Sequence, residues 1–226
     1  MKDTQKALYG LLLLLITLMT SASDLRAAEK DIDGHTINTV SIGGHIWMQE
    51  NLDVSRYRNG DPVRYAASNE EWLDAAAKGE GAWCYYQNDS ARNGKYGHLY
   101  NWYAVHDTRG LAPSGWHVSS DEEWNTLTKA LGGATVAGGK IKSTVPSFWF
   151  APNVGADNST HFSALPGGLR GTGAGFCFMG ESAYFWSSSE STPTISWYSV
   201  LNYHNASVIR ATEHNADGMS VRCVKD

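Results

Sequence analysis

The chain has 226 residues, of which 42% are hydrophobic and 12% aromatic, and its formal net charge is −5 at pH 7. This mildly acidic balance argues against a nucleic-acid partner, because proteins that bind nucleic acid concentrate lysine and arginine. The 23 glycines and the low share of charged residues predict a loop-rich domain with β-strands rather than a helical bundle.

The first 23 residues carry the pattern of a secretory signal peptide. Lys2 and Lys6 precede an apolar run at 11–19, and small residues follow it. The run is shorter than the roughly 20 apolar residues of a membrane span, so a retained anchor is the weaker alternative. We expect cleavage near Asp24 and export. The mature chain then has a net charge of −6, because two lysines and one aspartate are lost.

The remaining chain is expected to form one domain. We place a short N-terminal segment at 24–30 and a single domain at 31–226, because neither a linker nor an internal repeat divides this stretch. After cleavage, no other apolar run is long enough to predict a transmembrane segment.

The first half of the domain begins with a predicted hairpin. Apolar-alternating runs at 36–40 and 45–48 flank a Gly-Gly turn, as in a β-hairpin. A short helix is expected to begin near Asn69, with acidic residues in its first turn, and to end at Gly79. A short strand is expected at 83–86.

A second helix has the clearest pattern. Ser119 and Ser120 are each followed three residues later by glutamate, which is the capping-box arrangement. Trp124, Leu127 and Leu131 then recur at helical spacing, and glycines stop the helix. Its apolar face is expected to pack on a sheet.

The C-terminal part is rich in glycine, serine and asparagine and predicts many short strands. We expect these at 162–164, 175–178, 184–187, 195–201, 207–211 and 219–224. Helices early and strands late favour an α+β fold: short antiparallel sheets, long Gly/Ser/Asn-rich loops and about two short helices.

Eight short motifs follow one another along the domain. They are Asp33-Gly34, Ile42-Gly43, Trp47-Met48-x-Glu50-Asn51-Leu52, Tyr96-Gly97-x-Leu99-Tyr100-Asn101-Trp102-Tyr103-Ala104-Val105, Gly115-Trp116-His117-Val118, Ser163-Ala164-Leu165-Pro166-Gly167-Gly168, Phe185-Trp186-Ser187-Ser188-Ser189-Glu190 and Ser220-Val221-Arg222-Cys223-Val224. Each motif alone is weak, but in this order they resemble the Fibrobacter succinogenes major paralogous domain.

That resemblance implies an exported bacterial protein, located in the periplasm, at the cell surface or outside the cell. It also implies a fold similar to C-type-lectin-like domains, which share a looped architecture with formylglycine-generating enzymes. The family supplies no established catalytic residues, so none is transferred to this chain.

Calcium and other metals are not expected. Calcium needs six to eight oxygen ligands, and the loop at 89–94 places Ala91 and Arg92 in ligand positions. The Glu-Pro-Asn and Trp-Asn-Asp tripeptides of calcium-dependent lectins are absent from the sequence. Histidines are scattered singly, without the spacing of a metal site. We therefore predict neither a metal nor a cofactor.

One stretch combines aromatic rings with planar polar groups, as sugar-binding surfaces do. We predict that it contacts ligand through Trp197, Tyr198, Asn202, Tyr203, His204 and Asn205. The alternative for Trp197 and Tyr198 is that aromatic residues in a strand pack in the core. The three residues at 203–205 have the composition of a loop, which favours a functional role.

Catalytic patterns are weaker. Ser187-Ser188-Ser189 lacks the GxSxG elbow of a serine hydrolase. The glycine run at 171–175 does not lead into a helix that would hold phosphate. A convergence of His161, His204, His214 or Asp217 in one cleft would favour an enzyme.

Three cysteines remain after cleavage, and export permits one disulfide or three buried thiols. Cys177 falls where the resembled family is expected to vary, so Cys84 and Cys223 are the predicted pair. Such a bridge would close a very long loop and contribute roughly 4 kcal/mol by the chain-entropy model.

We therefore expect a non-enzymatic exported module that binds a glycan or a cell-surface protein. A divergent enzyme of formylglycine-generating architecture is the first alternative, and a structural surface protein is the second.

Overall fold

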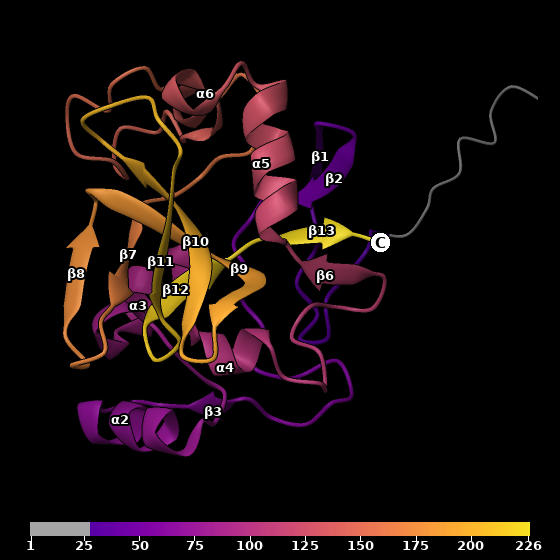
Figure 1. Ribbon diagram of the computed structural model, residues 1–226, viewed down its shortest axis with the longest axis vertical. Coiled ribbons are helices and arrows are strands. Elements are labelled where there is room, and N and C mark those ends of the chain that lie inside the picture. The colour runs from indigo at the N-terminus through magenta and orange to yellow at the C-terminus, as the bar shows by residue number, and fades with distance from the viewer. Residues whose placement is uncertain (1–27) are drawn as a thin grey trace, which may run out of the picture.

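The computed structural model describes residues 28–226, which form two β-sheets with short helices around them (Figure 1). The smaller sheet has the strand order β1-β2-β13-β6. Its strands are β1 (Thr39–Ile42), β2 (His45–Met48), β6 (Trp116–Val118) and β13 (Cys223–Lys225). The predicted hairpin is present as β1 and β2, which pair antiparallel from Thr39↔Met48 to Ile42↔His45.

The larger sheet has nine strands in the described residues and the order β11-β10-β9-β7-β12-β5-β4-β3, with β8 paired to β7. Its strands are β3 (Arg64–Tyr65), β4 (Ala82–Cys84), β5 (Leu99–Asn101), β7 (Gly167–Arg170), β8 (Phe176–Met179), β9 (Ser182–Thr192), β10 (Ile195–Asn202), β11 (Ile209–His214) and β12 (Gly218–Val221). Most strand pairs are antiparallel, as expected, but β3–β4, β7–β9 and β9–β12 pair in parallel.

The two predicted helices are present as α2 (Asn69–Lys78) and α5 (Asp121–Ala130). Each begins with a complete capping box, made by Ser68 with Glu71 and by Ser120 with Glu123. The apolar face of α5 packs on the sheets, since the Trp124 ring lies 5.1 Å from Trp47 and 5.3 Å from Phe185.

The described chain has five short α-helices rather than about two. The additional ones are α3 (Ser90–Asn93), α4 (Trp102–Val105) and α6 (Ala134–Ile141), and 3₁₀ turns form at η1 (Tyr86–Asn88) and η2 (Gly94–Tyr96). Helix α6 contains Gly138 and Gly139, which disfavour a helix in sequence. Both are needed for close packing, because a Cβ at Gly138 would clash with the Ser207 carbonyl oxygen and a Cβ at Gly139 with that of Gly155. Tertiary contact therefore overrides the local preference.

The last predicted strand, 219–224, is divided between the two sheets. Its first part is β12 of the larger sheet and its second part is β13 of the smaller one, with Arg222 between them. The chain on either side is fixed by Leu52, whose N–H donates to Val221 O, and by Ser119, whose N–H donates to Arg222 O. This crossing point forms the floor of the site described below.

The predicted signal peptide at 1–23 and most of the segment 24–30 lie outside the described residues. Within residues 28–226, no helix has the length and apolar character needed to cross a membrane.

Candidate functional site

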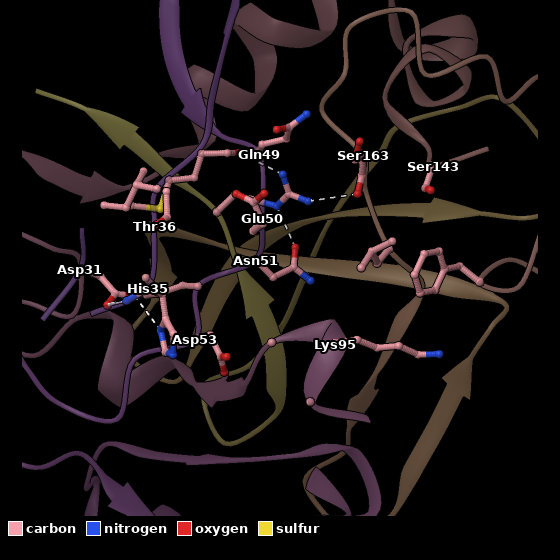
Figure 2. A pocket seen from close by; sticks show the side chains of 18 of the residues that line it. Asp31, His35, Thr36, Gln49, Glu50, Asn51, Asp53, Lys95, Ser143 and Ser163 are labelled. Atoms are coloured by element: carbon pink, nitrogen blue, oxygen red, sulfur yellow. Dashed lines mark hydrogen bonds and ion pairs between the residues drawn. The ribbon is translucent and has the colours of Figure 1, made fainter. Parts of the chain in front are cut away.

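A half-open cleft of about 600 Å³ lies where the two sheets meet (Figure 2). One wall comes from the segment 31–37, the floor from 48–53 and Arg222, and the opposite wall from 94–97 and from the loops at 143–148 and 163–165. Segments far apart in the sequence therefore converge on one hollow.

The wall at 31–37 is held to the domain by polar contacts. Asp33 accepts hydrogen bonds from the N–H and hydroxyl of Ser55 at 2.6 and 2.8 Å. Glu29 accepts from Trp116 Nε1 at 2.8 Å and lies 2.7 Å from Lys225 Nζ. These anchors lie on both sides of Asp31, so the wall has a defined position beside the cleft.

Arg222 is fully buried at the floor of the cleft. Its guanidinium donates to Asn51 Oδ1 at 2.7 Å and to the carbonyls of Met48 and Phe162 at 3.0 and 2.8 Å. It also lies 4.3 Å from the centre of the Phe162 ring. Burial lowers the pKa of Arg222 to about 9, and the nearby charge of Glu50 acts in the opposite direction. The contacted acceptors are neutral, so the floor retains positive character.

Charged side chains of both signs surround this floor. Asp31 and His35 lie on one side of Figure 2 and Lys95 on the other, with Glu50 and Asp53 between them. Asp31 Oδ2 is 3.0 Å from His35 Nδ1. Glu50 Oε1 accepts from Asn38 Nδ2 at 2.9 Å, and Asp53 Oδ1 lies 2.9 Å from Nε2 of the buried His98. The cleft therefore offers both hydrogen-bond donors and acceptors.

Apolar side chains complete the lining. They are Ile37, Met48, Leu52, Val145, Phe148 and Leu165. The ring of Phe148 is partly exposed, packs edge-on against Tyr96 with centroids 5.7 Å apart, and lies 5.1 Å from Lys95 Nζ. An apolar lining with a few converging polar groups is the usual character of a small-ligand site.

The predicted ligand residues Trp197 and Tyr198 lie in β10 and face opposite sides of the sheet, as neighbours in a strand do. Trp197 is covered by the guanidinium of Arg210, 3.2 Å from the ring centre, and Arg210 Nε pairs with Asp121 of α5 at 2.5 Å. Tyr198 packs against Trp186 and Tyr184. Burial raises the pKa of the Tyr198 phenol. Both rings are used in packing.

The other predicted ligand residues are Asn202, which ends β10, and the turn at 203–205 that follows it. Asn202 Nδ2 donates to Ser182 Oγ, and Asn205 Oδ1 accepts from the N–H of Ser207. The rings of Tyr203 and His204 lie 3.6 Å apart. The structure thus keeps 202–205 together at the end of β10, but none of the six predicted residues lines the cleft.

The predicted Cys84–Cys223 disulfide is not formed, and all three cysteines are free thiols. Cys84 lies in β4 of the larger sheet and Cys223 in β13 of the smaller one, in different hydrophobic clusters. Burial raises the pKa of the Cys84 thiol to about 11 and that of Cys223 further. Both behave as core residues. Cys177 is half-buried in β8.

Within residues 28–226, no group of three or more His, Cys, Asp or Glu side chains is placed to hold a metal ion. The considered convergence of His161, His204, His214 and Asp217 therefore forms no such cluster in the part of the chain that the structure describes.

The residues that sequence reasoning missed are Glu50, Asn51, Asp53 and Arg222. Three of them stand in two of the eight motifs, Trp47-Met48-x-Glu50-Asn51-Leu52 and Ser220-Val221-Arg222-Cys223-Val224. The available signal was that the two motifs could lie next to each other in the fold. Asn51 and Arg222 are far apart in the sequence but hydrogen-bonded in the structure.

A family model, the Fibrobacter succinogenes major domain, matches residues 40–225. The chain belongs to this family, in agreement with the resemblance found in the sequence. The floor and one wall of the cleft lie inside the matched residues, and the wall at 31–37 precedes them. No curated protein and no solved structure matches the chain.

Proposed function

We propose that the protein is an exported, non-enzymatic binding module that holds a glycan in the cleft above Arg222. The observation that carries this proposal is the lining of the cleft, which combines the partly exposed ring of Phe148 with the polar groups of Glu50, Asn51 and Asp53. The volume of about 600 Å³ falls within the range of pockets for small ligands.

The mixed charge of the lining favours a neutral polar ligand. Asp31, Glu50 and Asp53 stand against Lys95 and the buried Arg222, so a strongly charged ligand of either sign meets repulsion as well as attraction. A sugar hydroxyl both donates and accepts hydrogen bonds, and the apolar face of a sugar ring can rest on an aromatic ring.

Two further parts of the proposal rest on the sequence. Export is supported by the basic start and apolar run before residue 24. A lectin-like architecture is supported by family membership together with short sheets linked by long loops. A protein partner is the competing occupant of the same cleft.

The first test is a glycan-array screen of the purified protein, run with calcium and with chelator. We expect chelator-resistant binding to one class of neutral glycan. Calorimetry with the best glycan then compares Phe148→Ala with the wild-type protein. Loss of one aromatic contact is expected to weaken binding by about tenfold.

Phe150→Ala is the matched control, since Phe150 is two residues away, is 53% exposed and does not line the cleft. Its affinity is expected to equal that of the wild-type protein, with circular dichroism confirming that both variants fold. A silent array, or equal affinity for Phe148→Ala, contradicts the glycan proposal. Loss of binding on chelation contradicts the proposal that the cleft binds glycan without calcium.

A further inference from the structure

A column of three rings, of which the first two are stacked and the third is tilted, begins at the floor of the cleft. The buried His98 ring lies 3.6 Å from the Trp83 ring at an interplanar angle of 19°. The Trp83 ring lies in turn 4.6 Å from Tyr65 at 34°. Trp83 Nε1 donates to the Val63 carbonyl at 3.1 Å, which fixes the middle ring. The column is therefore rigid.

The inner end of the column contacts the cleft through Asp53. Asp53 lines the cleft, and its Oδ1 lies 2.9 Å from His98 Nε2. About a third of the Asp53 side chain is exposed, so the carboxylate contacts His98 and still faces solvent. A ligand in the cleft can donate a hydroxyl hydrogen bond to it.

The outer end of the column is an exposed aromatic face. Tyr65 is 42% exposed, and Trp83 supports the inner side of its ring. Tyr85 flanks the column edge-on, with ring centroids 4.8 Å from His98, 5.4 Å from Trp83 and 6.4 Å from Tyr65. Tyr85 also lies next to the cleft wall. A Cβ atom built onto Gly94, which lines the cleft, would lie 3.9 Å from the Tyr85 ring. Tyr85 therefore joins the cleft to Tyr65.

We propose that Tyr65 and Tyr85 form a second subsite, which binds one sugar ring of a neutral oligosaccharide while another unit of the same chain lies in the cleft at Asp53. This inference rests on the proposed glycan-binding function and specifies its ligand as a chain rather than a single sugar. The Trp83 ring lies between Tyr65 and His98, and His98 contacts Asp53. A single sugar ring is therefore too small to contact both Tyr65 and Asp53.

The surroundings of Tyr65 favour a neutral ligand over a cation. The adjacent Arg64 pairs with Asp74 at 2.9 Å and with Glu80 at 2.8 Å, so these three charges largely satisfy one another. Asp53 lies at the other end of the column, against His98. The carboxylates of Asp74 and Glu80 are thus already paired and less available to an ammonium group, whereas a sugar ring needs only the supported aromatic face. A rigid ring also loses little conformational entropy on binding.

The test is calorimetry of the full chain with neutral oligosaccharides of one to six units from the malto-, cello-, xylo- and chito- series. For the series that binds, affinity is expected to rise about tenfold as the chain grows past the unit in the cleft. Tyr65→Ala is expected to remove this dependence on length without changing the affinity for the shortest ligand. Tyr65→Phe keeps the ring and is expected to behave like the wild-type protein.

Phe178→Ala is the control, because Phe178 is another exposed aromatic residue (45%) and packs against Tyr184 instead of the column. Affinity that does not depend on length, or a Tyr65→Ala variant that keeps the dependence, overturns the second subsite. The proposed function then still stands if Phe148→Ala weakens binding. Absence of binding by the wild-type protein to every series overturns both proposals.

Discussion

The cleft and the segment 197–205, which is most of β10 and the turn after it, both contain polar and aromatic side chains but use them differently. In this segment, Trp197 is covered by Arg210, Tyr203 packs on His204, and Asn202 bonds to Ser182. In the cleft, Asp53 and Phe148 keep part of their surface open to the hollow. Composition therefore marks where binding groups are available, and packing decides which of them remain free.

A buried cation fixes each region. Arg222 lies under the cleft, and Lys142 lies under the turn, where its Nζ donates to the carbonyls of Val154, Asn202 and Asn205 at 2.9, 3.0 and 2.8 Å. Burial lowers the pKa of Lys142 to about 8. All three donors of Lys142 are satisfied within the protein, so this cation holds loops together and is not available to a ligand.

The largest expected effect is that of Lys142→Met. The variant leaves three carbonyls without their donor, and each unsatisfied buried group costs about 1–3 kcal/mol. We expect the free energy of unfolding in urea to fall by about 3–5 kcal/mol, with the turn at 202–205 losing protection from hydrogen exchange. Lys140→Met, on the same helix and half-exposed, is the control and is expected to change stability little. A loss below about 1 kcal/mol for Lys142→Met contradicts the structural role.

The second-largest expected effect is the pH dependence of stability caused by Asp217. This residue is buried between β11 and β12, and its Oδ1 has no hydrogen-bond partner. Burial, followed by the charge of Glu213, raises its pKa to about 7, against the opposing hydrogen bond from the Thr172 backbone. The unfolded-state pKa is about 3.9. The unfolded chain therefore releases its proton first, and the free energy of unfolding falls as pH rises from about 4 to about 7.

Asp217→Asn removes this titration. The variant is expected to be more stable than the wild-type protein at pH 8, and its advantage should grow by about 2 kcal/mol between pH 5 and pH 8. Thermal or urea unfolding at the two pH values measures the difference. An equal effect at both values would show that Asp217 ionises normally in the folded protein.

The smallest effect concerns the thiols. Cys84 and Cys223 are buried, and Cys177 is half-buried with a pKa raised by burial and then by the charge of Asp217. An aromatic disulfide reagent is therefore expected to find three thiols in the unfolded protein without reductant. In the folded protein the reagent should react with at most one thiol, that of Cys177. This reaction should be slow at pH 7 and should not occur in Cys177→Ser. Detection of only one thiol in the unfolded chain would show that the other two cysteines form a disulfide, as the sequence predicted.

The sequence predicted the elements whose signals are local. The helix start near Asn69, the capping box at Ser120 and the alternation around Gly43-Gly44 predicted α2, α5 and the first hairpin. Helix α6 was missed because its glycines are explained only by distant backbone packed against them, at 206–207 for Gly138 and at Gly155 for Gly139. The division of 219–224 between two sheets was missed for the same reason, since strand periodicity does not tell which sheet a residue joins.

The site was harder to predict than the fold. The motifs that contain Asn51 and Arg222 were recognised, but their meeting at 2.7 Å depends on the crossing of β12 into β13. Trp197 and Tyr198 were chosen for their residue type, and the structure places Tyr198 against the core through Trp186 and Trp197 under the guanidinium of Arg210. Exposure of aromatic faces such as Tyr65 is a property of the folded surface, and residue spacing does not encode it.

The most direct test of the cleft as the ligand site is a nuclear magnetic resonance titration of the isotopically labelled protein with the best glycan from the array. We expect the largest amide shifts at 50–53 and 94–97, with side-chain shifts at Arg222, while 202–205 stays unchanged. Shifts concentrated at Tyr203, His204 and Asn205 would contradict the assignment to the cleft and return the site to the turn after β10.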